Sequence, residues 1–225
     1  MIGIGLAVFQ QITGINAIIY YADKIFAQAG FSTPADQASA TTWAIGGVNV
    51  LATFIAVAYV DRFGRRPLLL AGLVGMASAL ITVGISFHFM DKADTSGAGS
   101  GGPTTAGIIT LVALVVFIAS FAFSLGPVVW TVINEIFPNR VRGRAVAVAT
   151  AVNWGSAWLV SQFFLTLIDS IGNSATFYLF GAFSVIAYVW IWRRVPETKG
   201  RSLEEIQQIW EHADPVQSQR DAGTL

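Results

Sequence analysis

Long apolar stretches separated by short polar breaks run along most of the chain. A bilayer core about 30 Å thick needs about 20 consecutive apolar residues in a helix. By that criterion six stretches predict membrane-spanning helices, at residues 2–22, 41–60, 67–89, 106–137, 145–168 and 175–192. The pattern therefore predicts an all-α membrane protein, a bundle of six transmembrane helices at 1–194 followed by a polar tail at 195–225.

The basic residues predict how these spans are oriented. Loops that carry most of the Lys and Arg residues face the cytoplasm. Eleven of the 13 basic residues lie on one side of the predicted bundle: Arg62, Arg65, Arg66, Arg140, Arg142, Arg144, Arg193, Arg194, Lys199, Arg201 and Arg220. The opposite loops hold Lys24 and Lys92. Both termini are therefore expected in the cytoplasm.

The polar tail carries a helix signal of its own. Ser202 reads as an N-cap with Glu205 at the third helical position, which is a capping-box pattern. The spacing of Leu203, Ile206 and Ile209 predicts a short amphipathic helix at about 202–212 on the cytoplasmic face.

Composition narrows the class of function. The chain is 54% hydrophobic and 12% charged, whereas a soluble domain carries about 25% charged residues. The net charge of zero gives no electrostatic reason to expect nucleic acid as a partner. The sequence has no cysteine, no cluster of metal ligands and no acid–base pair inside the spans, so we expect neither an enzyme nor a bound metal or cofactor. Because the first span begins almost at Met1 without a signal-peptide pattern, we expect a fragment or half of a longer protein.

The first predicted span contains polar side chains that are costly in hydrocarbon. Gln10, Thr13, Asn16 and Tyr20 fall within about 120° of one helix face, whereas Gln11 lies about 100° from Gln10. Either Gln11 serves a neighbouring helix, or Gly14 lets this helix unwind locally where it lines a cavity. Amides also act as interhelical glue. We favour a cavity, because polar residues within spans face the bundle interior or a water-filled path.

Amides and indoles recur in the other spans. Asn49 lies alone in the second span and suits either a hydrogen bond between helices or ligand binding. In the fourth span, Gly126-Pro127 predicts a break in the helix. Trp130 follows that break, and Asn153 stands beside Trp154 in the fifth span. Amides donate and accept hydrogen bonds, and indoles offer a flat apolar face. Because the spans carry no charge except near their ends, this combination predicts a neutral, hydroxyl-rich ligand.

Acidic residues accompany the arginines at every cytoplasmic end. The residues concerned are Asp61, Arg65, Arg66, Glu135, Arg142, Glu197 and Arg201. The positive-inside rule and turn formation explain the arginines but not the acids. We therefore favour an ion-pair gate that forms in the outward-open state and breaks in the inward-open one.

Five motifs together resemble the carboxy-terminal half of the sugar porter family of the major facilitator superfamily. They are QQITGINAIIYY at 10–21, DRFGRR at 61–66, GPVVW at 126–130, NEIFPNRVRGRA at 134–145 and VPETKGRSLEEI at 195–206. The resemblance implies one half of a major facilitator fold, in which two six-span halves bind sugar between them.

The family's functional positions map onto this chain. The resemblance implies sugar contacts at Gln10, Gln11, Asn16, Asn49 and Trp130, with Trp154 lining the pocket. It places Tyr20 and Tyr21 in an outer gate, Gly126 and Pro127 at a bend, and the acidic and basic residues listed above in cytoplasmic ion pairs. Where animal glucose carriers have a sugar-contacting glutamate, this chain has Ala122, which leaves the preferred sugar open.

The expected function is transport of a hexose or pentose across the plasma membrane by alternating access. The implied partners are the sugar, the lipid bilayer and an amino-terminal six-span half in the same or a separate chain. Proton symport and facilitated diffusion stay open. The alternatives are a membrane sugar sensor and a truncated fragment that does not transport.

Overall fold

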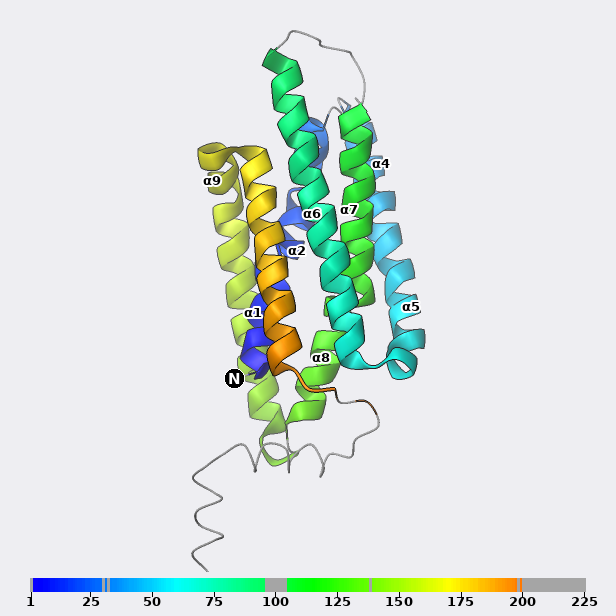
Figure 1. Cartoon of the computed structure of the whole chain (residues 1–225), viewed down its shortest axis with the longest axis vertical. Coiled ribbons are helices and arrows are strands. Elements are labelled where there is room, and N and C mark those ends of the chain that lie inside the picture. Colours follow the sequence, from blue (N-terminus) through cyan, green and yellow to red (C-terminus); the bar gives the residue numbers. More distant parts are fainter. Residues whose placement is uncertain are drawn as a thin grey trace, which may run out of the picture.

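The protein is an elongated bundle of helices whose long axes run nearly parallel (Figure 1). The computed structural model describes residues 2–29, 31, 33–95, 105–137, 139–197 and 199, and these contain no strand. The helices are α1 (Ile2–Ile12), α2 (Ile15–Tyr20), α3 (Ala22–Gln28), α4 (Pro34–Ala40), the π-helix η1 (Thr41–Gly47), α5 (Val48–Phe63), α6 (Arg65–Thr95), α7 (Thr105–Phe123), α8 (Leu125–Ile136) and α9 (Asn139–Arg194).

Among the described residues, five helical segments are long and apolar enough to cross a membrane. They are Ile2–Tyr20, Pro34–Val60, Arg65–Met90, Thr105–Ile136 and Arg140–Arg194. The first four correspond to the first four predicted spans. The fifth contains both remaining predicted spans, because α9 runs for 56 residues through Gly172, whose φ of 82° and ψ of 164° are not helical. The chain reverses direction there, so α9 consists of two limbs that lie side by side (Figure 1).

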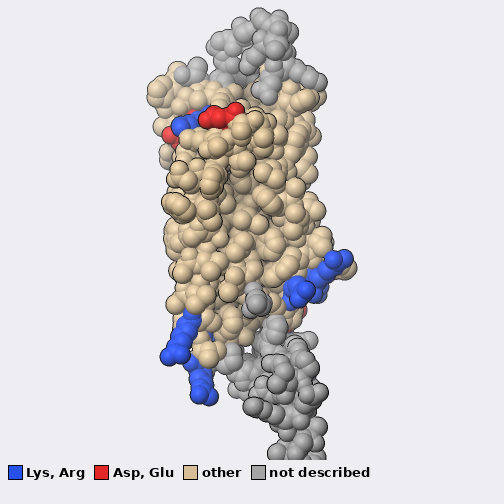
Figure 2. All heavy atoms as spheres, turned by 90° about the vertical axis from the view of Figure 1, so that its left-hand side faces the viewer, with Lys and Arg blue, Asp and Glu red and all other residues tan. Residues whose placement is uncertain are grey.

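The outer surface of the bundle is suited to lipid. Figure 2 shows Lys, Arg, Asp and Glu near the two ends of the visible face and an uncharged band between them. Large apolar side chains are exposed on several helices, among them Trp43, Phe54 and Phe89. A soluble protein would bury most of this surface, whereas a bilayer makes its exposure favourable.

Besides the reversal at Gly172, two other membrane segments are broken part-way along. Between α1 and α2 the backbone leaves the helix at Thr13 and Gly14, where Gly14 adopts φ 91°. Between α7 and α8 the break lies at Ser124, with φ −127° and ψ −87°. The sequence predicted this second break at Gly126-Pro127. Because a proline ring clashes with the carbonyl four residues earlier, Pro127 breaks the helix just after Phe123.

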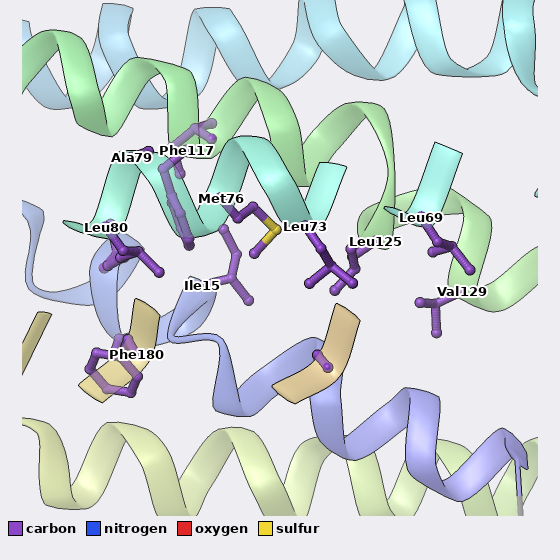
Figure 3. Close-up of a cluster of buried hydrophobic side chains, with 14 of the residues drawn as sticks. Ile15, Leu69, Leu73, Met76, Ala79, Leu80, Phe117, Leu125, Val129 and Phe180 are labelled. Carbon is purple, nitrogen blue, oxygen red and sulfur yellow. The ribbon is translucent and has the colours of Figure 1, made fainter. Parts of the chain in front are cut away.

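The apolar core packs around both breaks. Figure 3 shows Ile15 of α2 beside Leu73 and Met76 of α6, Leu125 of α8 and Phe180 of α9. All five side chains are at most 2% exposed. The core therefore holds the interrupted helices against the continuous ones. The predicted tail helix at 202–212 lies outside the described residues, so the division of the chain at residue 194 stays a prediction.

Candidate functional site

A chain of four buried or half-buried amides, carried by α1, α2 and α9, links these helices to the start of α8. The Nδ2 atom of Asn16 donates to Oε1 of Gln11 at 2.8 Å, and Nε2 of Gln11 donates to Oδ1 of Asn153 at 3.1 Å. The Nδ2 atom of Asn153 donates to Oε1 of Gln10 at 2.6 Å. The Nε2 atom of Gln10 then donates to the backbone oxygens of Leu125 at 2.8 Å and Gly126 at 3.3 Å. Residues from α1, α2, α8 and α9 thus meet at one polar site.

The break at Gly14 makes this arrangement possible. Gln10, Gln11 and Asn153 are only 3%, 5% and 3% exposed, so their amides need partners inside the protein. Both explanations offered for Gln11 hold, because it reaches α9 and the helix also unwinds at Gly14. Within the break, the hydroxyl of Thr13 donates to the backbone oxygen of Gln10 at 3.0 Å.

Three of the predicted sugar contacts lie apart from the amide chain. Asn49 is half-buried and lines a groove on η1 and α5 together with Gly46 and Thr53. The hydroxyl of Thr53 donates to the backbone oxygen of Asn49 at 2.7 Å. Trp130 is half-buried on α8 and packs against the core. Trp154 is 60% exposed on α9.

The neighbour of Trp154 also belongs to the amide chain. Asn153 makes three hydrogen bonds with α1, although the sequence pattern marked it only as an amide beside an indole. One buried amide in an apolar span was the available signal. Its partners could not be named, because helical periodicity does not identify the neighbouring helix.

The two tyrosines of the predicted outer gate differ in burial. Tyr20 is 55% exposed at the end of α2. Tyr21 is half-buried, and its hydroxyl donates to the backbone oxygen of Ser161 at 3.3 Å. Its ring stacks on Phe164, with the ring centroids 5.2 Å apart. Tyr21 therefore connects the start of α3 to α9.

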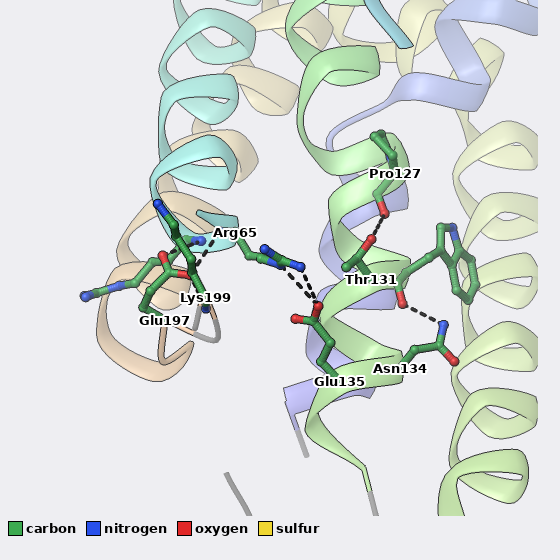
Figure 4. Close-up of polar contacts among 9 residues, drawn as sticks. Arg65, Pro127, Thr131, Asn134, Glu135, Glu197 and Lys199 are labelled. Atoms are coloured by element: carbon green, nitrogen blue, oxygen red, sulfur yellow. Dashed lines mark hydrogen bonds and ion pairs between the residues drawn. The ribbon is translucent and has the colours of Figure 1, made fainter. Parts of the chain in front are cut away.

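An ion pair joins α6 to α8 at the end of the bundle that carries most of the arginines and is predicted to face the cytoplasm. The guanidinium of Arg65 donates to the carboxylate of Glu135 through Nη2 at 2.8 Å and Nε at 3.2 Å (Figure 4). The two side chains are 14% and 26% exposed, so water screens the pair only in part. Arg65 and Glu135 both belong to the set of residues predicted to form cytoplasmic ion pairs.

Glu197 caps a helix in the same cluster. Its carboxylate accepts the backbone N–H groups of Arg65 at 3.0 Å and Arg66 at 3.1 Å, at the start of α6. It also accepts the N–H of Lys199 at 2.9 Å (Figure 4). A carboxylate at a helix N-terminus satisfies unpaired donors and interacts favourably with the helix dipole. Gly64, with φ 90°, lets the backbone pass close to this carboxylate.

Three further basic side chains at this end bind backbone carbonyl groups near helix ends; they belong to Arg66, Lys199 and Arg142. Arg66 donates through Nη2 to the oxygen of Trp192, and Lys199 donates through Nζ to the oxygen of Arg62 at 2.8 Å. Arg142 donates through Nε to the oxygen of Phe137 at 3.2 Å. Cations at helix C-termini are favourable for the same electrostatic reason. The side chain of Asp61 and the whole of Arg201 lie outside the described part of the chain.

Replacing Glu197 with glutamine should lower the free energy of unfolding by about 1 kcal/mol, because the variant loses a charged cap on α6. Thermal unfolding of the purified protein in detergent measures the change. Asp169, which is exposed, offers a control in Asp169→Asn that should leave the midpoint unchanged. Equal midpoints for Glu197→Gln and the wild type would contradict the capping role.

Among the described residues no group of three or more His, Asp or Glu side chains is placed to hold a metal ion. The buried polar side chains among these residues are the amides of Gln10, Gln11 and Asn153 together with hydroxyl groups of serine and threonine.

Comparisons with known proteins identify the family. A model described as sugar (and other) transporter matches residues 1–210. The arabinose-proton symporter of Bacillus subtilis (strain 168) is 40% identical over 210 residues, covering 93% of this chain and 42% of the relative. The D-xylose-proton symporter of Escherichia coli (strain K12) is 36% identical over 217 residues, covering 94% of this chain and 41% of the relative.

The fold is also similar to a solved structure. A proton:xylose symporter of the major facilitator superfamily, bound to 6-bromo-6-deoxy-D-glucose, superimposes with a TM-score of 0.78 at 35% identity, covering 93% of this chain and 42% of that one. The chain thus spans about two fifths of the length of these two symporters. It is an integral, multi-pass membrane protein that belongs to the sugar (and other) transporter family, a family of transporters and not of enzymes.

Proposed function

We propose that this chain is the carboxy-terminal half of a sugar porter that moves a hexose or pentose by alternating access. The observation that carries the proposal is the chain of neutral amides from Asn16 to Gln10. Its members join the broken segment α1–α2 to α9 and to the start of α8, and they carry no charge, which suits a polyhydroxylated, uncharged substrate. Two similar proteins are named as arabinose-proton and D-xylose-proton symporters.

In this proposal the two limbs of α9 act as separate spans, which brings the number of spans to six. Both termini then lie in the cytoplasm, and the protein belongs to the plasma membrane. The length of the similar symporters supports a partner with an amino-terminal six-span half, in the same or a separate chain. Rocking of the two halves around a central site would expose it to each side in turn.

The proposed sugar contacts divide by position. Gln10, Gln11 and Asn16 belong to the amide chain, whereas Asn49 reaches the sugar from the groove on α5. Trp130 stacks on or caps the sugar ring, and Trp154 lines the pocket from its exposed position on α9. These last two indoles would meet the substrate where the other half completes the site.

The moving parts are proposed at the two ends. Tyr20 and Tyr21 form the outer gate, and Gly126 with Pro127 supplies the bend in the fourth span. At the inner end the pair Arg65–Glu135 breaks when the site opens inward. Names of the similar symporters favour a coupled proton. Ala122, which is 1% exposed, leaves the choice of sugar to other side chains.

Replacing Gln11 with alanine should weaken sugar binding about tenfold, because the sugar loses at least one hydrogen bond. The side-chain oxygen of Asn153 also loses its donor. Binding and uptake of labelled D-xylose and L-arabinose are measured in vesicles that contain the complete transporter. Gln28→Ala, a change to an exposed amide on α3, is the matched control.

Three outcomes of this experiment are informative. Unchanged affinity in Gln11→Ala would contradict the site. Binding without uptake by the complete wild-type transporter would indicate a sugar sensor. Vesicles that contain this chain alone test whether it works without a partner, and absence of hexose and pentose uptake would reject an autonomous transporter.

A further inference from the structure

We propose that the end of α9 binds the headgroup of an anionic phospholipid through Arg193, Arg194 and Trp192. This surface site goes beyond the proposed transport function and does not depend on which substrate is carried. It lies on the outside of the bundle, whereas the amides of Gln10 and Gln11 are buried. Figure 2 shows basic side chains near the lower end of the face that includes α9.

The second limb of α9 places these side chains at the boundary of the membrane. The limb runs from Asn173 to Arg194, which is about 33 Å of helix at 1.5 Å per residue. The hydrocarbon core of a bilayer is about 30 Å thick. Because the limb crosses that core once, its last residues, Arg193 and Arg194, reach the layer of lipid headgroups.

Both arginines are exposed, and neither has a carboxylate or a hydrogen-bond partner among the described residues. Basic side chains in a last helical turn often bind the free carbonyl groups there. Here Arg66 of α6 does so, because its Nη2 atom donates to the oxygen of Trp192. The carboxylate of Glu197, a few residues further on, accepts backbone N–H groups at the start of α6. Two guanidinium groups are therefore left to bind an anion from outside the protein.

An exposed apolar stripe leads along the same limb to these arginines. Ile186, Val189 and Trp192 are 53%, 38% and 54% exposed, and their spacing of three residues keeps them on one side of the helix. Arg193 follows Ile186 by two helical turns, so the stripe and the basic end share a face. The indole of Trp192 offers an apolar ring and one N–H donor, which is typical of side chains at the membrane boundary.

This combination fits an anionic phospholipid better than a soluble anion or a zwitterionic lipid. Guanidinium groups bind phosphate oxygens in pairs, through charge-assisted hydrogen bonds. Acyl chains attached to that phosphate can lie along the apolar stripe, which a soluble anion would leave unused. A zwitterionic headgroup would bring another cation next to Arg193 and Arg194. Basic residues that flank a span attract anionic lipids for the same electrostatic reason.

Quenching of Trp192 fluorescence by brominated lipids tests the site. The chain is reconstituted in phosphatidylcholine vesicles that contain a minor share of brominated phosphatidylglycerol, or the same share of brominated phosphatidylcholine. Subtracting the signal of the matching Trp192→Phe protein isolates the emission of Trp192. We expect the wild type to prefer phosphatidylglycerol at least about tenfold, and Arg193→Gln and Arg194→Gln each to lower that preference about fivefold.

Two further variants separate a site from general surface charge. Arg140→Gln is the matched control, because it removes an exposed arginine from the other limb of α9. It should leave the quenching at Trp192 unchanged. Arg193→Lys keeps the charge but loses the paired hydrogen bonds, so it should retain part of the preference for phosphatidylglycerol.

Equal quenching by the two brominated lipids in the wild type would overturn the proposal. A loss in Arg140→Gln as large as that in Arg193→Gln would overturn it in favour of a diffuse positive surface. Relief of the quenching by soluble glycerol phosphate would replace the lipid with a free anion as the ligand. None of these measurements uses a sugar, so their outcome is independent of whether the proposed transport function holds.

Discussion

Replacing Gly72 with alanine should destabilise the protein by about 1–3 kcal/mol, which is the usual cost of overpacking a buried contact. A Cβ at Gly72 would lie 1.7 Å from Oγ and 2.3 Å from Cβ of Ser124, and 2.9 Å from the backbone oxygen of Ser120. Rotating the hydroxyl of Ser124 relieves only the first of these contacts. Helix α6 must therefore move away from the α7–α8 break, which loosens the core around Leu73 and Leu125.

Thermal unfolding in detergent, followed by tryptophan fluorescence, measures this effect. For a chain of this size about 1 kcal/mol corresponds to about 2–4 °C in the melting temperature. Gly155→Ala is the matched control, because no heavy atom lies within 4 Å of its added Cβ. Gly72→Ala combined with Ser124→Gly should recover part of the loss. Equal melting temperatures for Gly72→Ala and Gly155→Ala would show that α6 does not depend on this close approach.

Replacing Gly14 with alanine should impair both stability and sugar binding. A side chain at φ 91° costs about 1–2 kcal/mol, and the new Cβ would lie 3.1 Å from the ring of Phe180. Straightening the helix would relieve the strain. Gln11 and Asn16 would then lie about 140° apart around a regular helix, too far round to share a hydrogen bond. Either response disturbs the Asn16 end of the amide chain.

The two effects of Gly14→Ala can be separated by measuring melting temperature and D-xylose affinity on the same preparations. We expect a lower melting temperature and at least about tenfold weaker binding, since the bond between Asn16 and Gln11 is lost or strained. Gly155→Ala again serves as the control for the same chemical change. A fall in melting temperature with unchanged affinity would show that the break is needed for folding but not for the site.

Three of the four residues in the amide chain were predicted from the sequence. The cost of amides in an apolar span singled out Gln10, Gln11 and Asn16, and the structure brings all three together. The resemblance to sugar porters implied Trp154, which is exposed, as a lining residue and did not name Asn153, which joins the chain. A buried amide and an exposed indole look alike in a hydropathy pattern when they are adjacent in an apolar stretch.

The cytoplasmic charges show a second limit. The sequence predicted ion pairs among them, and Arg65–Glu135 is one. Glu197, Arg66 and Lys199 instead bind backbone groups at the ends of helices. Which charge finds a carboxylate and which finds a helix end depends on how α5, α6 and α9 meet, because both kinds of partner are attractive to an arginine or lysine.

The sequence alone determined the class of protein, the first four membrane segments and the presence of a polar site, because apolar length and the cost of buried amides are local properties. It predicted the break near Pro127 to within a few residues and offered unwinding at Gly14 as one of two explanations for Gln11. Only the tertiary structure decided the partners. The bonds from Gln10 to Leu125 and from Asn153 to Gln10 join residues 115 and 143 positions apart. Periodicity orients a side chain about its own helix axis, whereas packing of one helix against another decides which group it meets.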